Sequence, residues 1–308
     1  MNPDTLESIK RTNMDLDNIQ KVMELSREYG IGTYSELILG LPLETLESWK
    51  NGLCNLLESG QHDSIDVWFA QLLENSELAD SKTREKYNIQ SIVAKDYMSM
   101  QNYNYWDDIP ETIEIVNATS TMTTDDIVEA YMYAWTVVHF HITGYSQIYS
   151  KYLRNVNGID YRNFYDKLYN EISTNKNNFF NEHFVELKQV VATYLKTGEL
   201  NSSQYKGHNL LSKSAEYFYI NKQFVYDTAE KIFNHYSKID DSLKTLQRNI
   251  LFDERKDYPI VVNIEYNTLS WKKNPTTVTI DSRIKDYKSY NFYSMRRQNL
   301  IRNIIEVT

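Results

Sequence analysis

The chain has 308 residues, 41% of them hydrophobic and 24% charged, so it is long enough to bury a core in one large domain or two ordinary ones. It carries 42 acidic and 33 basic residues, a net charge of −9, which disfavours nucleic acid as a general partner. The sequence has no apolar run of about 18 residues and no apolar segment behind Met1, so we expect no membrane span, no secretory signal and a cytoplasmic location.

The N-terminal residues predict two helices. Asn2 can cap a short helix that has Pro3 at its first position and runs to about residue 10. Asp15 can cap a second helix, and Gly30 stands where a left-handed residue commonly ends such a helix.

The next segment predicts a strand, a helix and a second strand. An apolar run at residues 33–39 ends before Gly40, Thr45 can cap an apolar-faced helix, and a second apolar run covers residues 64–72. A helical crossover of this kind joins parallel strands and is right-handed. The predicted fold class of this part is therefore α/β.

The pattern changes after this segment. Weak periodicity and the polar, aromatic run 102–108 predict a loop, so we place a boundary that gives one domain of residues 1–108 and another of residues 109–308.

The second domain is predicted to be mostly α-helical. Thr123, with Asp126 three residues later, predicts the capped start of a long helix that ends near Gly144. Apolar residues at three- and four-residue spacing predict four further helices, at residues 161–173, 178–196, 212–236 and 241–251.

A small hairpin and a last helix are predicted at the C-terminal end. Alternating residues at 258–266 and β-branched residues at 276–280 favour a small C-terminal β-hairpin. A basic helix is expected around residues 294–305, where the charges are typical of a solvated face.

Glu36 is the first candidate for a ligand-facing residue. Strand alternation puts it on one face with Tyr34 and Ile38, while Leu37 and Leu39 occupy the other face. Because the leucines suit packing against helices, Glu36 should point to the inner side of the sheet, where a carboxylate needs a partner. The equally supported alternative is an edge strand in which Glu36 meets water.

Three more residues lie near the carboxyl ends of these strands, where ligands of α/β proteins bind. Gly40 and Glu44 follow the first strand, although Glu44 could simply stabilise a helix start. On the second strand, Ala70 shares the inner side with Glu36, together with Asp66 and Trp68. Its small side chain leaves room for a flat ring or fills a tight packing layer, and the spacing favours packing.

No metal site is predicted. Cys54 is the only cysteine, which excludes an internal disulfide and any site built from several thiolates of this chain, and its helical context predicts a small buried side chain. His139 and His141 lie about 200° apart on a helix of ~3.6 residues per turn, so they cannot bind one metal from one face.

Three segments together resemble the second half of a radical S-adenosylmethionine (radical SAM) domain, most closely the cobalamin-binding subgroup. They are residues 1–11, residues 36–45 with the Ile-Leu-Gly-Leu-Pro turn, and residues 72–79. The resemblance implies the second half of a partial (β/α) barrel followed by a helical accessory domain. In that family a [4Fe–4S] cluster reduces S-adenosylmethionine to a radical that abstracts a substrate hydrogen, and cobalamin relays a methyl group in the subgroup.

The resemblance also implies a cofactor site. Arg11, Glu36 and Ala70 match positions that touch S-adenosylmethionine in relatives. Arg11 would hold a carboxylate or hydroxyl through its fork of donors, Glu36 would accept from polar groups, and Ala70 would leave room beside the adenine. Gly40 and Glu44 complete the predicted cofactor-binding set, and no catalytic residue is predicted.

The sequence departs from the family pattern in three ways. Leu43 stands where the family usually has Gly, the Gln-Ser pair that precedes the position of Met1 is absent, and so is the Cys-x-x-x-Cys-x-x-Cys motif that ligates the cluster. We therefore expect the cluster and cobalamin only in an intact family protein, and no turnover by this chain alone. The chain is expected to be a fragment or, alternatively, a non-catalytic subunit that docks on a cluster-bearing chain; its small-molecule substrate is not predicted.

Overall fold

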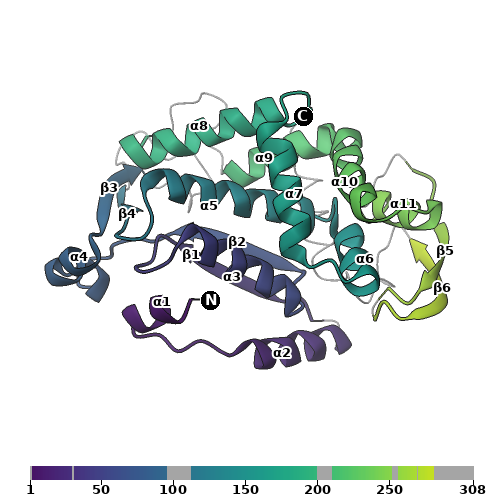
Figure 1. Ribbon diagram of the computed structural model, residues 1–308, viewed down its shortest axis with the longest axis horizontal. Coiled ribbons are helices and arrows are strands. Elements are labelled where there is room, and N and C mark those ends of the chain that lie inside the picture. The colour runs from purple at the N-terminus through teal and green to yellow at the C-terminus, as the bar shows by residue number, and fades with distance from the viewer. Residues whose placement is uncertain are drawn as a thin grey trace.

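The protein is a mixed α/β structure in which helices lie on both sides of a small parallel sheet. The computed structural model describes residues 2–29, 31–95, 112–199, 210–251, 256–268 and 270–280. Within these ranges it contains three two-stranded sheets. Figure 1 shows α1 and α2 on one side of the β1–α3–β2 unit and a layer with α5, α7 and α8 on the other.

The two N-terminal helices begin where their caps predict. The side chain of Asn2 accepts a hydrogen bond from the backbone N–H of Asp4 at the start of α1 (Pro3–Ser8). Asp15 does the same for Asn18 at the start of α2 (Leu16–Glu28). Helix α1 ends before residue 10, and Gly30 lies outside the described residues.

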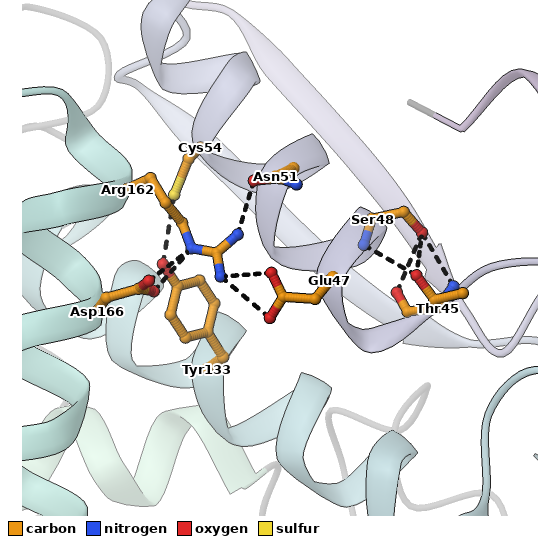
Figure 2. Close-up of polar contacts among 8 residues, drawn as sticks. All are labelled: Thr45, Glu47, Ser48, Asn51, Cys54, Tyr133, Arg162 and Asp166. Carbon is orange, nitrogen blue, oxygen red and sulfur yellow. Dashed lines mark hydrogen bonds and ion pairs between the residues drawn. The ribbon is translucent and has the colours of Figure 1, made fainter.

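The predicted strand–helix–strand unit is confirmed. It consists of β1 (Tyr34–Leu39), α3 (Leu46–Glu58) and β2 (Ser64–Phe69). The strands are parallel and in register from Tyr34 opposite Ser64 to Leu39 opposite Phe69. Thr45 and Ser48 form a full capping box at the start of α3 (Figure 2).

The segment after β2 contains regular structure that its weak periodicity did not predict. A 3-10 turn (Glu77–Ala79) and α4 (Ser81–Tyr87) lead into β3 (Gln90–Lys95), which pairs antiparallel with β4 (Thr112–Ala118). The two strands lie on either side of the predicted domain boundary, which falls among residues outside the described ranges together with the predicted loop 102–108. The division into two domains therefore stays a prediction.

The rest of the described chain is mostly helical, as predicted. Its elements are α5 (Thr124–Val137), a π-helix (Val138–Ile142), α6 (Gln147–Asn157), α7 (Tyr161–Thr174), α8 (Asn181–Thr197), α9 (Leu210–Ile220), α10 (Lys222–Tyr236) and α11 (Asp241–Arg248). The capping box of Thr123 and Asp126 starts α5. The single helix predicted over residues 212–236 is wrong, because the chain breaks at Asn221, whose side-chain amide donates to the carbonyl of Tyr217 and so competes with the helical backbone.

The predicted hairpin is confirmed as β5 (Ile260–Tyr266) and β6 (Lys273–Ile280), which pair antiparallel. The basic helix predicted around residues 294–305 lies outside the described residues. Among the helices that the structure describes, none combines the length and apolar character needed to cross a membrane.

Helix α3 links the parallel sheet to the helical layer. The indole N–H of Trp49 donates to the carbonyl of Ala130 in α5 at 3.0 Å, inside a core that both parts share. The Nε–H of Arg162 in α7 is shared between both carboxylate oxygens of Asp166, and its two terminal nitrogens donate to Asn51 and Glu47 of α3 (Figure 2). The sheet is therefore held on the helices by apolar and by polar contacts.

Two glycines at helix ends have the same backbone conformation but different surroundings. Gly158 and Gly198 end α6 and α8 with almost equal φ angles of 73° and 72°. A Cβ at Gly158 would meet nothing within 4 Å, whereas one at Gly198 would lie 2.2 Å from the carbonyl oxygen of Val93 in β3.

We expect Gly158→Ala to lower the free energy of unfolding by about 1 kcal/mol, the cost of a left-handed alanine. Gly198→Ala should cost about 1–3 kcal/mol more, because backbone atoms of β3 must move aside. Urea unfolding of both variants measures the difference. Equal losses would show that β3 can withdraw from α8 without cost.

Candidate site at the carboxyl ends of the parallel strands

The face of β1 and β2 turned away from the helical layer carries polar side chains. The hydroxyl of Tyr34 lies 2.7 Å from Oε1 of Glu36 and 3.0 Å from Oδ2 of Asp66. Its one proton is therefore within hydrogen-bond distance of two carboxylates, which lie opposite each other in the strand register. Burial, Glu36 and Asp66 together raise the pKa of Tyr34. Glu36 thus lies on the predicted face of the strand together with Tyr34. It is also exposed, and the described residues place no strand beside the second edge of β1, as the edge-strand alternative expected.

Arg11, Glu36 and Ala70, which the sequence places far apart, line one open cavity of about 620 Å³. Trp68 and Leu41 complete much of its wall. Within the part of the chain that the structure describes, the guanidinium of Arg11 makes no ion pair, and the buried indole N–H of Trp68 has no hydrogen-bond partner. The cavity therefore offers a cation and an N–H donor beside the carboxylate of Glu36.

A smaller cavity of about 90 Å³ shares Arg11 and Glu36 with the first and is also lined by Glu44, Thr5 and Ser48. Only 8% of Glu44 is exposed, and burial raises its pKa although Ser48 donates to its carboxyl group. The hydroxyl of Thr5 is buried and has no partner among the described residues. Thr5 and Ser48 were missed by the sequence reasoning, because nothing in their local pattern distinguishes them from ordinary residues of a first helical turn.

Gly40 is placed differently from the other predicted residues. It is buried with a φ of 99°, and a Cβ there would lie 3.5 Å from the side chain of Val116 in β4. It does not line either of these two cavities. Leu43, which replaces the glycine usual in the family, has a φ of 63°, a conformation that favours glycine.

His62, His139, His141 and Cys54 are buried and engaged with neighbouring residues inside the fold. His141 bridges His62, at 2.9 Å, and the hydroxyl of Tyr165, at 2.7 Å, while Nδ1 of His139 lies 3.0 Å from the carbonyl of Trp135. Cys54 is buried, as predicted, and burial raises its pKa to about 12. Among the described residues no cluster of three or more His, Cys, Asp or Glu side chains could hold a metal ion.

The buried carboxyl of Glu44 predicts a pH effect. Because its folded-state pKa is raised above 4.5, its contribution to stability is fully present below that pH and is lost as the pH rises through the folded-state pKa. Glu44→Gln removes this ionisation and keeps a hydrogen-bonding side chain. We expect the variant to gain stability relative to the wild type as the pH rises from 4.5 to neutral.

Urea unfolding of both proteins over that pH range measures the effect. The comparison cancels the titration of the other carboxyl groups, so a stability difference that does not change with pH would show that Glu44 titrates normally.

Comparison with known proteins found relatives but no matching family model. The chain is 36% identical over 165 residues, 54% of its length, to the cobalamin-dependent radical SAM methyltransferase TokK of Streptomyces tokunonensis. It is 29% identical over 197 residues, 64% of its length, to the 2-(S-pantetheinyl)-carbapenam-3-carboxylate methyltransferase of Streptantibioticus cattleyicolor. The matched parts make up 24% and 29% of these two relatives, so the chain spans only about a quarter of the length of either.

Proposed function

Since homology to cobalamin-dependent radical SAM methyltransferases confirms the resemblance drawn from the sequence, we propose that this chain forms part of the S-adenosylmethionine site of such an enzyme. The observation that carries the proposal is the cavity shared by Arg11, Glu36 and Ala70. In this proposal β1, α3 and β2 are part of a (β/α) barrel, and the helices from α5 onward are an accessory domain. The substrate is a small molecule that accepts a methyl group.

The side chains of the cavity fit the chemistry of S-adenosylmethionine. The guanidinium of Arg11, which pairs with no carboxylate among the described residues, suits the carboxylate of S-adenosylmethionine. The carboxylate of Glu36 suits its ammonium group or ribose hydroxyls, and the small Ala70 leaves a flat surface for the adenine. Tyr34 would hold Glu36 in place through its hydroxyl. Gly40 takes a positive φ of 99° in the turn after β1, and Glu44 lines the adjoining small cavity.

The chemistry itself requires groups from outside this sequence. In the family, a [4Fe–4S] cluster and cobalamin beside S-adenosylmethionine supply the radical and the methyl carrier. The only thiol here is buried in α3, where Sγ of Cys54 lies 3.4 Å from the hydroxyl of Tyr133 (Figure 2). We therefore propose that the cluster is held by a different segment or chain and that this chain alone has no turnover.

Binding of S-adenosylmethionine to the purified chain tests the site. Arg11→Gln and Glu36→Gln should each weaken binding by about tenfold, the usual scale for a lost charge-assisted hydrogen bond. Ala70→Leu should weaken it further by filling the cavity. Isothermal titration calorimetry gives the affinities, and Glu28→Gln, an exposed residue of α2, is the control.

If all four variants bind like the wild type, the cavity is not the site. Circular dichroism of each variant shows whether a loss of binding reflects a loss of fold.

An exposed apolar surface supports the proposed docking of a cluster-bearing part. We call it the N-terminal apolar face; its large side chains are 37–73% exposed and belong to Met14, Leu16, Val22, Leu25, Tyr29, Ile31, Tyr34 and Ile38. Exposed apolar side chains that gather in this way can mark interaction sites, and Tyr34 and Ile38 belong to β1, whose second edge has no neighbouring strand among the described residues. We propose that the missing half of the barrel covers this face, from a separate chain or from the same polypeptide.

Leu25→Asp tests the docking. If the cluster-bearing part is a separate chain, it should co-elute with this chain under oxygen-free conditions and carry the visible absorbance of an iron–sulfur cluster. A carboxylate at position 25 should release it, because it cannot be buried unpaired. Val185→Asp on α8 is the control, since Leu25 and Val185 are 54% and 53% exposed.

If the cluster-bearing chain still co-elutes with the Leu25→Asp variant, its contact lies elsewhere on the molecule.

A further inference from the structure

Trp68 lies in the middle of the wall of the larger cavity. Arg11 and Glu36 line both cavities at the carboxyl ends of the strands, whereas Trp68 lines only the larger one. The same is true of Ala70. In the sequence, Trp68 comes two residues after Asp66, which lies opposite Glu36 in the register, and two residues before Ala70. Trp68 therefore lies between the charged end of the cavity and the end at Ala70.

The side chain of Trp68 belongs to the cavity side of β2. It is half-buried, while its neighbours Val67 and Phe69 are 5% exposed and belong to the core shared with the helical layer. Within the described ranges, no aromatic ring stacks on the indole of Trp68, and no lysine or arginine lies over it. Trp68 thus gives the cavity an aromatic surface that neither a ring nor a cation of the described residues occupies.

S-adenosylmethionine carries the positive charge of its sulfonium in the middle of the molecule. The sulfonium sulfur joins the amino-acid part to the ribose, and the adenine is attached to the other side of the ribose. In the proposed site Arg11 holds the carboxylate and Ala70 lies against the adenine, so the sulfonium falls between them, beside Trp68. The face of an indole ring attracts a cation because its π-electrons place negative charge there, and among side chains tryptophan does so best.

We infer that Trp68 binds the sulfonium by a cation–π contact and makes the site favour S-adenosylmethionine over S-adenosylhomocysteine, its neutral demethylated thioether. This inference rests on the proposed function. The two compounds share the carboxylate, ammonium group, ribose and adenine, so contacts from Arg11 and Ala70 cannot tell them apart. The carboxylates of Glu36 and Asp66 also attract a cation, and the test must therefore remove the ring alone.

Calorimetric titration of the purified chain with each of the two compounds tests the inference. Trp68→Leu should weaken binding of S-adenosylmethionine about fivefold more than binding of S-adenosylhomocysteine, the scale of a cation–π contact at a partly exposed site. Trp68→Phe keeps an aromatic face but lacks the indole N–H, so it should retain most of the preference. Phe179→Leu removes a ring that is 41% exposed and lines neither cavity, and it should leave both affinities unchanged.

The ratio of the two affinities guards against misfolding, because misfolded protein lowers the number of sites for both compounds alike. Trp68→Met gives the same comparison if circular dichroism shows that Trp68→Leu does not fold.

The outcomes separate this inference from the proposed function. Equal weakening for both compounds in Trp68→Leu, or no weakening for either, would overturn the inference and leave the proposed site in place. A complete loss of the preference in Trp68→Phe would also overturn it, because the indole N–H would then be the contact. If the wild type binds neither compound, the proposed site is wrong and the inference is wrong with it.

Discussion

The contact of α3 with α5 and α7 is the constraint on which the rest of the structure depends. Two parallel strands alone expose too much surface to be stable, so β1 and β2 need a covered face. Helix α3 covers that face and is itself held by α5 and α7. Trp49 of α3 packs in the shared core and donates to the carbonyl of Ala130 in α5, and Arg162 of α7 donates to Asn51 and Glu47 of α3. Because α3 is fixed in this way, the strands and the side chains at both of their ends are fixed as well.

This arrangement leaves one face of the sheet free for ligands. Leu39, Val67 and Phe69 are buried on the helical side, while Tyr34 and Glu36 are exposed on the other. At the carboxyl ends this face borders a cavity lined by Arg11 and Glu36, and Arg11 makes no ion pair with any of the described residues. The residues to which the family resemblance assigns a cofactor-binding role thus include three that line this one cavity, Arg11, Glu36 and Ala70.

Features that depend on a few neighbouring residues could be predicted. The caps of Asp15, Thr45 and Thr123 are satisfied within four residues of chain, and strand alternation placed Glu36 on the free face. Strand β3 was missed because it is short and half-exposed, and its backbone partners are distant in sequence: β4 on one edge and the carbonyl of Gly198, just after α8, which accepts from the N–H of Lys95. The break at Asn221 was missed because local amide chemistry outweighed an apolar pattern that continues across it.

By itself, the sequence determined the parallel strand–helix–strand unit and the side of β1 that bears Glu36, because periodicity and helix caps depend on residues close together in the chain. It also determined that this sequence lacks the thiolates for a cluster, because that needs only a count of cysteines. The homology that its motifs indicated was then found in two methyltransferases. Only the tertiary structure decided that Arg11 lines one cavity with Glu36 and Ala70, because this proximity comes from packing between elements far apart in the chain.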